Sequence, residues 1–212
     1  MLDIESFVAV LRVGGVVIYP LLLLAVVAGV VVLEKTFVFA VRARPPASVL
    51  PLVETYGFSW EELDQALGAL ETKNYFGRFV RAIADNRPRP AWWVESRAAE
   101  EASLIERSLA RWLWVLETIV TAAPLLGLLG TITGMIRAFK LFGTEGLVDP
   151  RGVTAGVAEA LIATAVGLFI ALIALFAFNY FSQRQVQFMD ELEHLGTRLV
   201  DAIRLAEKEG LP

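Results

Sequence analysis

The chain has 212 residues, of which 56% are hydrophobic and 20% are charged, and its formal net charge is −4. Soluble domains carry about 45–50% apolar and 25% charged residues, so part of this chain is expected to lie in an apolar environment. The weakly acidic balance, without a basic stripe, argues against a nucleic-acid partner. The chain has no cysteine and one histidine, His194, which excludes disulfides and a multi-histidine metal site within one subunit.

The first uncharged run, residues 13–33, is long enough for a helix that crosses the ~30 Å hydrocarbon core of a bilayer. It lacks the short apolar core and small-residue cleavage site of a secretory signal peptide. We therefore expect segment 1–40 to hold an outside N-terminal tail and a retained transmembrane helix.

Segment 41–111 is predicted to be a helical loop. Its Pro-rich stretch 45–51 interrupts helix, and Ser59 with Glu62 has the spacing of a capping box. A second helix is expected over Tyr75–Ala84, with an apolar face made of Phe76, Phe79, Val80 and Ile83. From about Trp92, the pattern predicts a helix that continues without interruption into the second span.

Two further apolar runs predict transmembrane helices within 112–140 and 152–183, joined by a short periplasmic loop over 141–151. The third run contains one charge, Glu159. Segment 184–212 is predicted to be a helical cytoplasmic tail. Its apolar residues recur at three- to four-residue spacing, which is typical of a packed helix face: Val186, Met189, Leu192, Leu195, Leu199 and Ile203.

The positions of lysine and arginine predict the orientation of the spans. Arg12 alone precedes the first span, whereas Lys35, Arg42, Arg44 and Arg111 flank the ends of the loop between spans one and two. By the positive-inside rule, the N-terminus is outside, and the large loop and the C-terminus are cytoplasmic. The predicted fold is an all-α, multi-pass membrane protein whose second and third helices extend into the cytoplasm.

Small residues recur on one face of each of the last two spans. In the second span the face comprises Ala123, Gly127, Thr131, Gly134 and Ala138, and in the third Gly156, Ala160, Thr164, Gly167, Ala171 and Ala174. Small residues let helix backbones approach closely where lipid removes the hydrophobic incentive to associate. We expect close packing, within or between subunits, at Gly127, Gly130, Gly134, Gly156, Ala160 and Gly167.

An ionisable group such as Glu159 within a span costs on the order of 3 kcal/mol, so it usually faces a bundle interior or a wet cavity. The alternative is that Glu159 lies near the outer interface and reaches toward headgroups. Thr131 and Thr164 are candidates to line the same cavity and relay a proton, although a membrane threonine often bonds its own helix carbonyl. Glu159 and Thr164 lie about 140° apart around a helix, so we expect one to face the pathway and the other a subunit boundary.

Two segments carry a family resemblance. PLLGLLGTITGMIRAF (124–139) and AEALIATAVGLF (158–169) resemble the second- and third-span signatures of the MotA/TolQ/ExbB proton-channel family. The predicted topology is also similar to that of this family. The resemblance implies that Thr131, Thr164 and Glu159 line a pore formed by the second and third spans of a homopentamer.

The resemblance further implies a dimeric, single-span ExbD- or TolR-like partner in the pore and a TonB- or TolA-like energy transducer beyond it. The expected function is that of a bacterial inner-membrane stator subunit that converts proton motive force into mechanical work on an outer-membrane transport or Tol–Pal type system. No cofactor is expected. The alternative is a passive membrane scaffold that conducts no ions. An enzyme is not expected, because the sequence shows no nucleophile paired with a base, no metal cluster and no phosphate-binding loop.

Overall fold

The computed structural model describes residues 15–44, 52, 59–68, 74–140 and 150–209. Its principal helices are α2 (Ile18–Phe37), η1 (Val38–Arg42), α4 (Trp60–Gly68), α5 (Tyr75–Ala84), α6 (Ala91–Ala110), α7 (Leu113–Lys140) and α8 (Pro150–Glu209). The chain divides into two compact units. The first comprises Met1–Val32 and Trp112–Tyr180, and the second comprises Leu33–Arg111 and Phe181–Pro212.

Three helical stretches in the described part of the chain are long and apolar enough to cross a membrane, at Ile18–Arg42, Ala91–Lys140 and Arg151–Lys208. The prediction of three helices capable of spanning a membrane is therefore confirmed. The start of the first predicted run, the Pro-rich stretch 45–51 and most of the short loop 141–151 lie outside the described residues.

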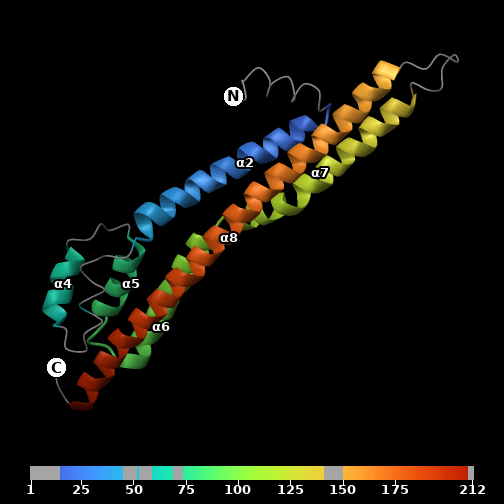
Figure 1. The fold of residues 1–212 in the computed structure, drawn as a ribbon. Coiled ribbons are helices and arrows are strands. Elements are labelled where there is room, and N and C mark those ends of the chain that lie inside the picture. Colours follow the sequence, from blue (N-terminus) through green and yellow to red (C-terminus); the bar gives the residue numbers. More distant parts are fainter. Residues whose placement is uncertain (1–14, 45–51, 53–58, 69–73, 141–149, 210–212) are drawn as a thin grey trace. The chain divides into compact units, whose positions relative to one another are not determined.

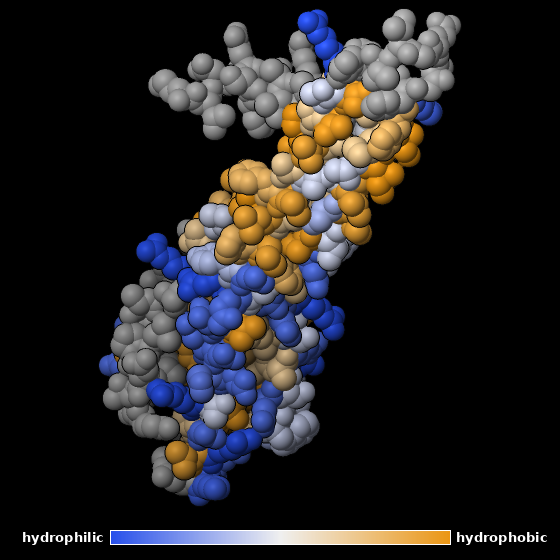
Figure 2. All heavy atoms as spheres, turned by 45° about the vertical axis from the view of Figure 1, so that its right-hand side comes forward, coloured by the Kyte–Doolittle hydropathy of each residue, from blue (hydrophilic) through white to orange (hydrophobic). Residues whose placement is uncertain are grey.

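In the first unit α7 and α8 run side by side (Figure 1). Many large apolar side chains of these spans face outward, among them Leu125, Phe169 and Phe176. Figure 2 shows that hydrophobic residues cover the visible face of the spans. Hydrophilic residues cover most of the visible face of the second unit. An outward apolar surface of this kind suits lipid as the surrounding solvent.

The expectation of an uninterrupted helix from Trp92 into the second span is wrong. α6 ends at Ala110, Arg111 has an extended backbone (φ −51°, ψ 131°), and Trp112 has a φ of 67°. A positive φ is uncommon for a bulky residue, so the surrounding structure must hold this break. The buried Lys35 contributes to it, because its Nζ donates a hydrogen bond to the carbonyl of Leu109 at 2.8 Å.

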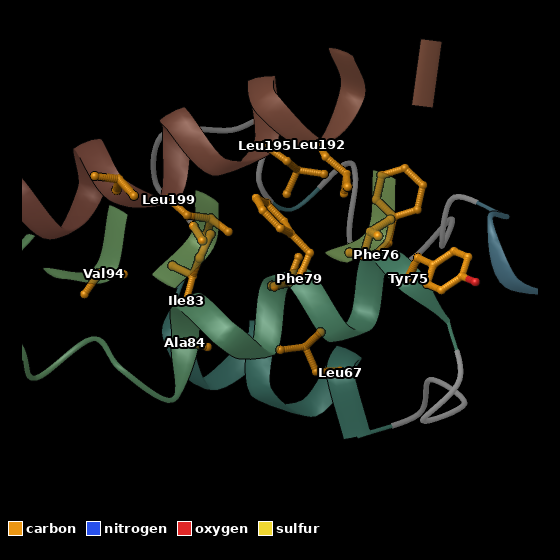
Figure 3. Close-up of a cluster of buried hydrophobic side chains, with 14 of the residues drawn as sticks. Leu67, Tyr75, Phe76, Phe79, Ile83, Ala84, Val94, Leu192, Leu195 and Leu199 are labelled. Carbon is orange, nitrogen blue, oxygen red and sulfur yellow. The ribbon is translucent and has the colours of Figure 1, made fainter. Parts of the chain in front are cut away.

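The core of the second unit is built from α4, α5, α6 and the C-terminal part of α8 (Figure 3). α5 has the predicted bounds, and its four predicted apolar residues are all buried. Its N-terminus is capped by Asn74, whose side chain accepts a hydrogen bond from the Gly77 amide at 3.1 Å. The Ser59 hydroxyl accepts from the Glu61 amide at 3.2 Å, which gives the N-terminus of α4 a serine cap.

The predicted helical tail is the continuation of α8, so the third helix extends beyond its apolar run, as predicted, and reaches Glu209. Of the predicted apolar stripe, Leu192, Leu195, Leu199 and Ile203 are buried and Met189 is partly buried, whereas Val186 is exposed. Phe188 takes the buried position instead, with its ring 4.5 Å from that of Phe76. The expectation for Val186 is therefore wrong, because the residue that contacts the α5 aromatics lies two positions further along, at Phe188.

Candidate functional site

The small-residue faces of α7 and α8 pack against each other within one chain. A Cβ added to Gly134 would lie 2.8 Å from Cβ of Ala160, and one added to Gly156 would lie 3.0 Å from Cβ of Ala138. At Gly167 it would lie 2.5 Å from the carbonyl oxygen of Ala123. The side chains would clash, so these positions require small residues, and the backbones of the two spans are in close contact.

All six residues predicted at this packing face are buried: Gly127, Gly130, Gly134, Gly156, Ala160 and Gly167. Gly130 lies against Ala163 and Gly127 lies against the backbone of Thr164. Thr131, which the spacing placed on the same face, is only half-buried. The sequence left open whether these faces meet within or between subunits, and for this pair of helices they meet within the subunit.

The two predicted pore threonines make different hydrogen bonds. The Thr164 hydroxyl donates across the helix pair to the carbonyl of Gly127 at 2.8 Å. The Thr131 hydroxyl donates to the carbonyl of Leu128 on its own helix at 2.6 Å. The common role of a membrane threonine therefore describes Thr131, whereas Thr164 joins α8 to α7.

Glu159 forms an ion pair with Arg137, whose Nη1 lies 2.7 Å from the carboxylate Oε1. The Glu159 side chain is 18% exposed and that of Arg137 is 49% exposed. Arg137 lies in the last turn of α7, where a cation interacts favourably with the negative end of the helix dipole. Arg137 is part of the second-span motif, and no local signal in the sequence links it to a residue 22 positions away.

The first span also reaches this ion pair. Gly15 has a φ of 67°, and the Glu159 carboxylate occupies the space that a Cβ on Gly15 would fill. The carbonyl of Gly15 accepts a hydrogen bond from the amide of Ile18, the first residue of α2, at 3.2 Å. Residues of the second and third spans and the backbone just before the first span therefore meet at the Glu159 carboxylate.

The structure does not bring the three predicted pore residues into one hydrogen-bonded group. Glu159 and Thr164 both bond to α7 of the same chain, but at separate positions along it, to Arg137 and Gly127 respectively. Thr131 bonds to neither of them in the contacts that the structure describes. Among the described residues, no group of three or more His, Cys, Asp or Glu side chains is placed to hold a metal ion.

These features define a class: an all-helical, multi-pass membrane protein in which two spans pack through small residues and carry an ion pair and an interhelical threonine bond. Comparison with known proteins narrows that class. The chain belongs to the MotA/TolQ/ExbB proton channel family, which it matches over residues 71–194.

The proteins similar to this chain include ExbB-type biopolymer transport proteins and a TolQ protein. The biopolymer transport protein ExbB-like 1 of Synechocystis sp. is 33% identical over 195 residues, which are 88% of this chain and 74% of that protein. ExbB of Aquifex aeolicus is 36% identical over 76 residues, 36% of this chain and 51% of that protein. The Tol-Pal system protein TolQ of Pseudomonas aeruginosa is 42% identical over 79 residues, 37% of this chain and 34% of that protein.

Proposed function

We propose that this chain is the proton-conducting stator subunit of an inner-membrane motor of the ExbB/TolQ type. In this proposal a homopentamer surrounds a dimeric, single-span ExbD- or TolR-like partner and drives a TonB- or TolA-like transducer. Membership of the proton channel family and the likeness to ExbB and TolQ proteins support it. The basic residues at the ends of segment 41–111 support a periplasmic N-terminus and a cytoplasmic C-terminus.

The observation that carries the proposal is the placement of polar groups in the α7–α8 pair. An ion pair and an interhelical threonine bond lie in two spans that otherwise present small and apolar residues. Polar groups inside a membrane are costly and usually mark an ion or proton pathway. In the proposed mechanism Thr131 and Thr164 relay protons to an aspartate of the partner, and Glu159 sets the electrostatic field of the pathway.

The hydroxyl geometry is compatible with such a relay. Each of the two hydroxyls donates its hydrogen to a backbone carbonyl, so its oxygen lone pairs remain able to accept a further hydrogen bond. A proton passes when the hydroxyl accepts one hydrogen and rotates to release the other. Removing the hydroxyl while keeping the shape of the side chain should therefore interrupt the relay without opening the helix pair.

The test is proton flux in vesicles reconstituted with the complex purified from its host membrane, followed with an entrapped pH-sensitive dye. We expect Thr164→Val to lower the flux by about tenfold or more, because it removes one hydrogen-bonding group from the path. Thr133→Val is the matched control, since Thr133 lies in α7, the other helix of the pair, and donates only to carbonyls of its own helix, those of Leu129 and Gly130. It should conduct like the unmodified chain.

The passive scaffold makes the opposite prediction. A scaffold tolerates the combined replacement of Thr131 and Thr164 by valine and of Glu159 by glutamine, and it supports normal energised function in the host. Full activity of that triple variant, in a complex that assembles normally, would remove the proton pathway from the account.

A further inference from the structure

The Glu159 carboxylate is fixed from three directions. Arg137 of α7 donates to Oε1 at 2.7 Å, and the backbone at Gly15 lies directly against the same carboxylate oxygen. Glu159 itself is held by α8, where Ala160 beside it is buried against Gly134. A side chain in this arrangement has little freedom to change rotamer while the three spans stay packed.

The ends of the helices favour the same arrangement of charge. Arg137 lies in the last turn of α7, next to the negative end of that helix dipole, and Gly15 precedes the first turn of α2, next to the positive end of that one. The cation and the carboxylate are thus each close to a helix terminus of opposite sign. Together with the ion pair, this stabilises a carboxylate at the junction of the three spans.

Arginine limits what this carboxylate does in a proton pathway. A guanidinium has five N–H donors and no acceptor, and it stays protonated in proteins, so it neither delivers a proton to Glu159 nor takes one from it. A carboxylate that relays a proton takes it from one group and gives it to another, so it needs hydrogen-bond reach to both. The closed contact among Arg137, Gly15 and Glu159 instead suits a fixed charge.

We propose that Arg137 is a positioning residue, which holds the Glu159 carboxylate as a fixed anion at the junction of the three spans. The effect of Arg137 on conduction then passes entirely through Glu159. This inference rests on the proposed function for its effect on proton flux, but the coupling between the two side chains is independent of that function.

The experiment is a double-mutant cycle of Arg137→Gln and Glu159→Gln in the purified complex, with proton flux and thermal unfolding measured on the same preparations. We expect each single variant to lower the flux by about tenfold or more, because each removes one charge-assisted hydrogen bond and the energy of such a bond corresponds to about that factor. The double variant should conduct no less than Glu159→Gln alone. Arg137→Lys, which keeps a cation, should stay within about threefold of the unmodified chain.

Lys140→Gln is the matched control, because Lys140 lies in the same last turn of α7 and is exposed. It should leave flux and unfolding unchanged. The proposal is overturned if Arg137→Gln conducts normally, or if the two losses multiply in the double variant, which would give Arg137 a role of its own.

The unfolding measurement separates this inference from the proposed function. If the unmodified complex moves no protons, the proposed function fails. In that case the fixed ion pair is supported when the double variant loses less stability than the sum of the two single variants, and it fails when the losses are additive.

Discussion

Gly167 lies where the backbone of α8 comes closest to that of α7. A Cβ at this position would lie 2.5 Å from the carbonyl oxygen of Ala123 and 3.1 Å from Cα of Gly127, and both of these are backbone atoms. Backbone cannot rotate away as a side chain does, so Gly167→Ala must push the two spans apart. We expect it to lower the free energy of unfolding by about 1–3 kcal/mol, the usual cost of overpacking, measured by thermal unfolding in one detergent.

Gly29→Ala is the matched control for that change. Gly29 lies in the first span, and a Cβ there would meet nothing within 4 Å. Alanine is the better helix former by about 1 kcal/mol, so this variant should be as stable as the unmodified chain or more so. Equal destabilisation by the two alanines would show that close backbone contact does not hold the α7–α8 pair.

The packing residues could be predicted from sequence, whereas the contacts of the polar residues could not. Helical spacing identified five of the six small residues of the packing face, because burial follows from helical periodicity. The sixth, Gly130, did not follow from that spacing, which placed the half-buried Thr131 on the face instead. Glu159 stood out as the one charge in its span. Its partner Arg137 and the approach of Gly15 depend on how three separate helices align, and no local pattern encodes that alignment.

At the scale of elements, the end of α6 depends on a residue far away in sequence. The last four carbonyls of a helix have no partner within it, and one of them, that of Leu109, accepts from the Nζ of the buried Lys35 at 2.8 Å. The Glu34 carboxylate lies 3.6 Å from the same Nζ. Lys35 therefore acts as a C-terminal cap of α6 just before the break at Trp112.

Replacing Lys35 by methionine keeps an unbranched side chain that is one atom shorter, and it removes the donor. We expect Lys35→Met to make the last turn of α6 open more easily, by about 1–3 kcal/mol, because a buried carbonyl is left without a partner. Hydrogen exchange of the amides of residues 107–110 measures this opening. As a control, Lys208→Met changes an exposed residue in the last turn of α8 and should leave the exchange of residues 107–110 unchanged. Unchanged exchange in Lys35→Met would show that Lys35 does not cap α6.

The elements themselves were largely predictable. The lengths of the apolar runs predicted three spans, and the amphipathic pattern predicted α5 with its observed bounds. The break between α6 and α7 was not predicted, because no glycine or proline occurs near Arg111 and Trp112 to signal it. It is maintained by tertiary contacts such as the Lys35 bond, which sequence periodicity cannot reveal.

At the scale of the whole molecule, the two units have different cores. The described residues of the first unit pack through small residues and expose large apolar side chains. The second unit buries aromatic and aliphatic side chains such as Phe76, Phe79 and Leu192. Its tail is tied to α6 through polar contacts, where Glu207 accepts from the amide of Ala91 at 2.9 Å and Arg204 pairs with Glu95 at 2.6 Å.

This difference in cores agrees with two separate roles in the proposed motor: the spans form the proton pathway, and the second unit lies in water. Spans that pack through close backbone contacts form a firm wall for a pathway. A polar helical unit with its own core suits an aqueous compartment, which in the proposed orientation is the cytoplasm. The stator proposal therefore requires several copies of this chain to assemble around a partner, because neither a single chain nor a closed helix pair provides a pore.

Native mass spectrometry of the complex, extracted gently from its host membrane, tests that requirement most directly. The account predicts a pentamer of this chain that carries two copies of a small, single-span protein, and the identity of that protein would name the client system. A monomer or dimer from well-preserved membranes, without such a partner, would contradict the stator function.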